Sequence, residues 1–172
     1  MSVFRFTVPG HSTRRELAVY IIVGRRVDDS EFFAYVGKTG DNRAGCNPVI
    51  SRAGNHFSYN KIHSQVRNKV TDPHLFDHEY FYVTFDTYDD DNRNIDMVNE
   101  MERATNRELQ KRLSPGFTSC LKNPYKGSGF LPAAEKEVRR QFMTSERQRL
   151  VSALVDAVVD YIESFNAEFA HR

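Results

Sequence analysis

The sequence predicts an α/β (α+β) domain, in which a small antiparallel three-stranded sheet is flanked by helices. Two apolar runs, LAVYIIV (17–23) and EFFAYVG (31–37), are joined by the polar turn GRRVDDS, which is typical of a β-hairpin. A third run rich in β-branched and aromatic residues, HEYFYVTFD (78–86), predicts the third strand. Helical patterns separate and follow these strands, so the element order β-β-α-β-α leads into a C-terminal helical extension.

Two helices are predicted between the second and third strands. PVISRAG (48–54) suits a short helix. In SYNKIHSQVRNKV (58–70), Ile62, Val66 and Val70 are four residues apart, which is the spacing of a helical stripe.

After the third strand we expect one long helix, a surface loop and further helices. Asp96 is a plausible N-cap for a helix ending at Leu113, and the Gly-, Pro- and Ser-rich segment 117–132 is expected to be a loop. Pro132 suits a first helical position, and Ser145–Gln148 matches a capping box. The last helix has a wide apolar face formed by Val151, Leu154, Val155, Val158, Ile162, Phe165 and Phe169.

Composition indicates an ordinary globular chain without membrane spans. Of the 172 residues, 40% are hydrophobic and 27% are charged, and no apolar run approaches the ~20 residues that cross a bilayer. The N-terminus has no secretion-signal pattern, and Cys46 and Cys120 favour reduced thiols, so we expect a cytoplasmic protein. We expect an arm (1–15), a core (16–131) and C-terminal helices (132–172) that pack on the core or form a homodimer interface.

Positive charge is concentrated in one segment, although the net charge is only +1. Between residues 38 and 69, the one acid is Asp41. The basic residues there are Lys38, Arg43, Arg52, Lys61, Arg67 and Lys69. Phosphates respond to such a local patch, so the sequence is compatible with a nucleic-acid partner.

The hairpin and the residues after it resemble the GIY-YIG nuclease superfamily. Ala18-Val19-Tyr20 stands in for the first tripeptide and Tyr35-Val36-Gly37 for the second. Arg52 is followed four residues later by His56, as in the family, and a helical glutamate and Asn123 come after the third strand. The resemblance covers roughly residues 16–125.

The resemblance implies an endonuclease of restriction or phage type that hydrolyses DNA with Mg²⁺, or with Mn²⁺ as the alternative. It gives Tyr20 the task of receiving or relaying the proton of the attacking water, and it gives Tyr35 a supporting role. A guanidinium pairs well with a phosphate, so Arg52 is the expected clamp. A tyrosine has a pKa of ~10, so we expect Arg52, Lys38 and His56 to lower the pKa of Tyr20.

The metal-binding glutamate has three candidates. Glu102 lies closer to the predicted buried side of its helix than Glu100, so it is preferred. Glu108 also points toward that side, and its distance in sequence to Asn123 is the more usual one in the family. The buried side itself is marked by Met97, Met101, Ala104 and Thr105.

Arg43, Lys61 and Asn123 are expected to bind the substrate. Asn123 precedes a proline and would also serve as a simple turn former. The acidic run Asp89–Asp91 lacks the glycine and bidentate glutamate of a calcium loop, so we interpret it as a solvated loop. The alternatives to an enzyme are a catalytically inactive module that binds nucleic acid or protein, and an interaction protein that uses its C-terminal helix.

Overall fold

The computed structural model describes residues 3, 5–26, 28, 31–39, 47–87, 92–113, 115–126 and 133–170. Its strands form one antiparallel sheet in the order β2-β1-β3, which confirms the predicted mixed α+β class. The strands are β1 (Glu16–Arg26), β2 (Phe32–Lys38) and β3 (Phe76–Thr87). The helices are α1 (Val49–Asn55), α2 (Asn92–Arg112), α3 (Ala133–Phe142) and α4 (Ser145–Ala170), with 3-10 segments η1 (Gly10–Thr13), η2 (Pro73–Leu75) and η3 (Pro115–Cys120).

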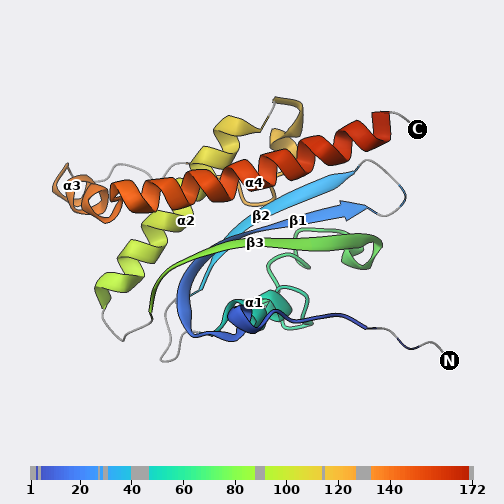
Figure 1. Ribbon diagram of the computed structural model, residues 1–172, viewed down its shortest axis with the longest axis horizontal. Helices are drawn as coiled ribbons and strands as arrows, with labels where there is room; N and C mark the ends of the chain where they lie inside the picture. Colours follow the sequence, from blue (N-terminus) through green and yellow to red (C-terminus); the bar gives the residue numbers. More distant parts are fainter. Residues whose placement is uncertain are drawn as a thin grey trace.

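The sheet separates two layers (Figure 1). Helices α2 and α4 lie on one face, and α1 with the residues that follow it lies on the other. Side chains alternate along a strand, so Val19 and Ile21 join the cluster under α2 and α4, whereas Tyr20 and Ile22 join the cluster on the α1 side. The two tyrosines of the hairpin therefore point toward α1.

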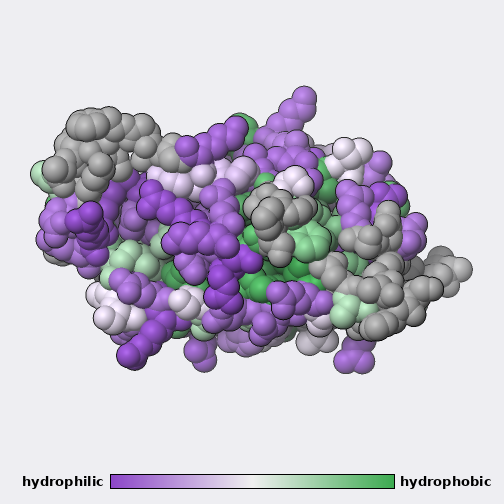
Figure 2. Space-filling model, turned by 90° about the horizontal axis from the view of Figure 1, so that it is seen from above, coloured by the Kyte–Doolittle hydropathy of each residue, from purple (hydrophilic) through white to green (hydrophobic). Residues whose placement is uncertain are grey.

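Helix α4 buries its apolar face within the chain. Val155 and Val158 are fully buried in the same cluster as the α2-facing residues of β1. Arg112 of α2 and Asp156 of α4 form an ion pair at 2.8 Å. Seen from the side of α4, most of the surface is hydrophilic, with hydrophobic side chains gathered near its centre (Figure 2). From Val151 to Phe165, the apolar stripe predicted for this helix is thus buried by packing within the chain.

The segment 58–70 forms consecutive turns, so the prediction of a helix there is wrong. The Ser64 hydroxyl hydrogen-bonds the backbone carbonyls of Ser58 and Asn60, and the Asn60 side chain accepts the backbone N–H of Ile62. Such local side-chain bonds compete with a helix for backbone groups. Ile62 is 74% exposed, so the four-residue spacing does not mark one buried stripe.

Two other boundaries differ from the predictions. Helix α2 begins at Asn92, before the predicted cap at Asp96. The backbone N–H of Arg147 bonds the Thr144 hydroxyl at 3.3 Å, so the cap of α4 lies one residue earlier than the predicted Ser145.

The expected surface loop after α2 is partly structural. Leu121 is buried and forms a parallel bridge with Ala34 of β2, and the Lys122 N–H donates to the Ala34 carbonyl at 2.9 Å. This segment therefore covers the outer edge of β2.

Several sequence predictions lie outside the described residues: those on Arg43, Cys46, Asp89–Asp91, Pro132 and the side chain of Phe169. Within the described ranges, no helix is both long enough and apolar enough to cross a membrane.

Candidate active site

Tyr20 of the central strand β1 lies across from Gly37 of β2, and its ring occupies the space that a side chain at Gly37 would need. A Cβ added at Gly37 would lie 2.4 Å from both Cζ and the hydroxyl oxygen of Tyr20. A glycine is therefore required at position 37 of the Tyr35-Val36-Gly37 tripeptide, because a side chain there would collide with the buried Tyr20 ring. Tyr20 is 1% exposed.

Helix α1 brings His56 to this tyrosine. The helix ends at Asn55, and His56 continues the helical conformation as its C-cap, so Arg52 and His56 lie about one turn apart. The Tyr20 hydroxyl lies 2.6 Å from Nε2 of His56 in a buried hydrogen bond. The Tyr35 ring packs edge-on against the His56 imidazole, with ring centroids 5.0 Å apart. The structure thus brings both tyrosines and the histidine together.

Burial raises the pKa of Tyr20 well above its usual value, so the expected lowering is wrong. The Arg52 guanidinium acts in the opposite direction, through its charge and a hydrogen bond, while Tyr35 and Glu102 add to the rise in pKa. Desolvation of the phenolate exceeds the help from one cation. Tyr20 is therefore a neutral phenol near neutral pH, and it lies within electrostatic reach of Arg52 and Glu102.

Tyr80 of β3 is a neighbour that the sequence analysis did not single out. Its ring centroid lies 6.4 Å from that of Tyr20, and its hydroxyl donates to the Ala53 carbonyl of α1 at 3.3 Å. Burial raises the pKa of Tyr80 above its usual range. The alternation of residues along the third strand could have identified Tyr80 from the sequence. Tyr80 pairs with Ile22 and lies with it on the α1 side of the sheet.

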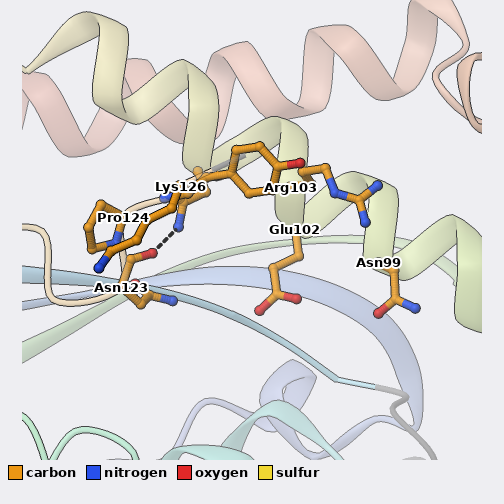
Figure 3. Close-up of a pocket in the computed structure, with 8 residues that line it drawn as sticks. Asn99, Glu102, Arg103, Asn123, Pro124 and Lys126 are labelled. Atoms are coloured by element: carbon orange, nitrogen blue, oxygen red, sulfur yellow. Dashed lines mark hydrogen bonds between the residues drawn. The ribbon is translucent and has the colours of Figure 1, made fainter. Parts of the chain in front are cut away.

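Glu102 extends from α2 toward the sheet beside Asn99, which precedes it by about one turn (Figure 3). Nζ of Lys38, the last residue of β2, lies 3.4 Å from the Glu102 carboxylate and also donates to the Asn99 side-chain oxygen. Lys38 thus forms its ion pair with Glu102, whereas the sequence led us to expect that its charge would act on the Tyr20 hydroxyl. Asn99 was missed from the sequence, although its spacing of three residues from Glu102 puts both on one helical face.

The other two glutamates have different surroundings. Glu100 forms an ion pair with Arg103, and Glu108 lies 3.5 Å from Lys111. The structure therefore places Glu102, the candidate preferred from helical periodicity, beside the tyrosine and lysine of the hairpin.

Asn123 holds the backbone of β2. Its side chain accepts the Val36 N–H at 3.0 Å and donates to the Val36 carbonyl at 2.6 Å. Asn106 in turn donates to the Asn123 carbonyl at 2.7 Å and accepts the Tyr125 N–H at 2.9 Å. Asn123 thus holds in place the strand that carries Tyr35 and Gly37, through two hydrogen bonds between its amide and the Val36 backbone.

A pocket of about 390 Å³ lies between α2 and the segment after Asn123. Glu102 and Asn99 line it from the helix, and Pro124 and Lys126 line it from the segment (Figure 3). Arg103 contributes a second cationic side chain. The Glu102 carboxylate therefore borders a pocket that is also lined by the cationic side chains of Arg103 and Lys126.

Oxygens of Glu102 and Asn99 lie close together, since both contact Nζ of Lys38. Among the described residues, no group of three or more His, Cys, Asp or Glu side chains is placed to bind a metal. The carboxylate that lines this pocket is that of Glu102, beside the Asn99 amide. Mg²⁺ keeps several of its waters and often uses only one or two carboxylates. The Glu102 carboxylate and the Asn99 amide oxygen both contact the ammonium of Lys38, so this position carries a cationic group.

The two remaining residues expected to bind substrate are Lys61 and Arg43. Lys61 is exposed in the turn segment after α1. Arg43 lies outside the described residues.

Comparisons of the chain with protein-family models, with curated proteins and with solved structures found no match.

Proposed function

We propose that this protein is a Mg²⁺-dependent endonuclease that hydrolyses DNA phosphodiester bonds. The observation that supports this best is the buried pair of Tyr20 and His56, with Arg52 and Glu102 both within electrostatic reach of the tyrosine hydroxyl. Phosphodiester hydrolysis needs a proton acceptor for the attacking water, a cationic clamp for the phosphate and charge neutralisation, and these side chains supply the chemistry.

The proton of the water moves through two residues in this proposal. Tyr20 has a raised pKa and is a neutral phenol, so it does not act as a standing phenolate base. Its hydroxyl accepts the proton of the attacking water as it passes its own proton to Nε2 of His56, 2.6 Å away. Tyr35, packed on the imidazole, fixes the orientation of the histidine ring.

The phosphate is held by cationic side chains. Arg52 offers paired donors to two phosphoryl oxygens and stays charged at all working pH values. Glu102 and Asn99 would hold the divalent cation, which would supply charge neutralisation at the phosphoryl group. The Lys38 ammonium, beside the Glu102 carboxylate, is a further cationic group for the phosphate.

A plasmid assay with three variants tests the proposal. Supercoiled DNA is incubated with Mg²⁺ and, separately, with Mn²⁺. We expect nicking or linearisation by the wild type and a loss of at least about a hundredfold in Glu102→Gln and Arg52→Ala, because each removes charge stabilisation from the transition state. Glu108→Gln is the matched control, since this glutamate pairs with Lys111 and is expected to keep full activity.

The outcomes separate the alternatives. Equal loss in Glu108→Gln and Glu102→Gln would contradict the choice of carboxylate. DNA binding without cleavage, across both metals and several DNA forms, would contradict the enzyme and favour an inactive nucleic-acid-binding module.

A further inference from the structure

The turn segment 57–71, between α1 and η2, carries an exposed aromatic ring with a guanidinium stacked on it. Arg67 lies over the Tyr59 ring, with its guanidinium carbon 4.1 Å from the ring centroid. Tyr59 is nevertheless 88% exposed. A tyrosine this exposed contributes little to the core and presents its ring to the solvent.

This segment is firmly built rather than loosely attached. Val66 and Val70 are buried in the cluster that contains Tyr20 and Tyr35. The Arg67 guanidinium donates through Nε to the Phe57 carbonyl at 2.8 Å, which fixes the stacked group in place. The platform is therefore pre-organised, and a ligand that stacks on it would not have to order the segment first.

The segment is directly joined to the candidate site. The backbone N–H of Arg67 donates to the carbonyl of His56 at 3.1 Å. His56 is the residue that hydrogen-bonds Tyr20. The backbone of the segment that carries the stacked pair is thus anchored to the backbone of the proposed proton acceptor.

The charge of the segment is of one sign. The sequence has no Asp or Glu between residues 42 and 71. Lys61, Arg67 and Lys69 belong to this stretch, and none of the three forms an ion pair with a residue in the described part of the chain. An exposed aromatic ring in a segment of basic side chains is a combination with which proteins hold unpaired nucleotides, since bases stack on the ring and phosphates contact the charges.

We propose that Tyr59 and Arg67 form a stacking platform for an unpaired base of the nucleic-acid strand that enters the candidate site, and that Lys61 and Lys69 contact its phosphates. This inference rests on the proposed function and specifies its substrate: a DNA with an unstacked or single-stranded stretch beside the cut. Because each base has an aromatic face, the platform favours unpaired structure over any particular sequence.

Binding in EDTA tests the platform without cleavage. Fluorescence anisotropy compares a labelled single strand with the matching duplex. We expect Tyr59→Ala to weaken single-strand binding about tenfold, the size expected for one lost base stack, and Tyr59→Phe to bind like the wild type. Ile62→Ala is the matched control, because Ile62 is exposed in the same segment and is outside the stack.

Two further readouts separate stacking from charge. A 2-aminopurine base placed near the scissile position should be quenched on binding to the wild type and not on binding to Tyr59→Ala. Lys61→Ala and Lys69→Ala should each reduce the slope of log affinity against log salt by about one, whereas Tyr59→Ala should leave the slope unchanged.

The result that overturns the platform is equal single-strand affinity in Tyr59→Ala and wild type, or no binding of single strands by the wild type. These results do not depend on catalysis. If Tyr59→Ala loses binding while the wild type fails to cut any DNA, the platform stands and the nuclease proposal falls. If the wild type cuts and Tyr59→Ala retains both affinity and KM, the nuclease stands and the platform falls.

Discussion

The Tyr20 hydroxyl and Nε2 of His56 are 2.6 Å apart in a buried hydrogen bond that joins the central strand to the end of α1. The two rings meet edge to face, with centroids 5.7 Å apart. This pair fixes α1 on the sheet and also fixes Arg52, which lies one turn before His56. The same contact thus serves stability and the proposed chemistry, and the two roles need separate measurements.

A double-mutant cycle isolates the stability role. Tyr20→Phe keeps the ring and removes the hydroxyl, and His56→Asn removes the imidazole. We expect each single variant to lower the free energy of unfolding by about 1–3 kcal/mol, because a buried polar group loses its partner. The coupling energy from urea unfolding should be about 1 kcal/mol. A coupling near zero would mean that the bond contributes little to the fold, whatever its part in catalysis.

Gly37→Ala should disturb Tyr20 directly. The added methyl would lie 2.4 Å from the tyrosine hydroxyl, and the buried ring has no space into which to move. We expect a loss of about 1–3 kcal/mol in unfolding free energy, as for other overpacked core sites, together with a loss of cleavage.

Gly54→Ala is the matched control for this change. Nothing lies within 4 Å of a Cβ added at Gly54, which sits in α1. Alanine favours a helix over glycine by up to about 1 kcal/mol, so thermal unfolding should show equal or higher stability. Similar destabilisation by both variants would contradict the specific role of Gly37.

The buried tyrosines should make the protein sensitive to alkali. Burial raises the folded-state pKa of Tyr20 and of Tyr80, whereas in the unfolded chain both titrate near ~10. Between these values the folded state holds more protons, so the free energy of unfolding falls as pH rises above ~10. Tyr80→Phe should reduce this pH slope in urea titrations at pH 9 to 11. An unchanged slope would mean that Tyr80 ionises in the fold without penalty.

Local patterns were enough to predict much of the fold. The β1–β2 hairpin, α1 and β3 follow from apolar alternation and turn chemistry over a few residues, and all are present. Helical periodicity also favoured Glu102, and Met97, Met101 and Thr105 are indeed buried on that side of α2. Each of these inferences needs only the residues of a single element or of two neighbouring elements.

Properties that depend on distant packing escaped the sequence analysis. The raised pKa of Tyr20 results from burial under α1 and beside β3, which no local pattern reports. The turns of 58–70 arise because hydroxyl and amide side chains capture backbone groups that a helix would use. Asn123 acts on Val36, a residue 87 positions away in the sequence, so its amide could not be recognised as a backbone clamp.

Asn123→Ala should loosen β2 at the position of the hairpin motif. The substitution removes an acceptor from the Val36 N–H and a donor from its carbonyl, and both groups lie on a strand covered by Leu121. We expect a loss of about 2–4 kcal/mol in unfolding free energy, from two backbone groups that lose their partners. Hydrogen exchange at the Val36 amide should accelerate more than exchange at Val19. Unchanged protection of Val36 would contradict the clamp.

Removal of the Lys38 charge should strengthen divalent-metal binding. The ammonium lies 3.4 Å from the Glu102 carboxylate and is only 14% exposed, so an incoming cation must displace it or suffer its repulsion. At an effective dielectric between that of water and that of a protein surface, one such charge amounts to about 1 kcal/mol or more. We therefore expect Lys38→Met to bind Mn²⁺ about fivefold more tightly in EPR titrations and to cut DNA more slowly. Lys111→Met, which removes the partner of Glu108, is the matched control and should leave Mn²⁺ affinity unchanged. Unchanged or weaker binding by Lys38→Met would show that Glu102 does not hold the metal.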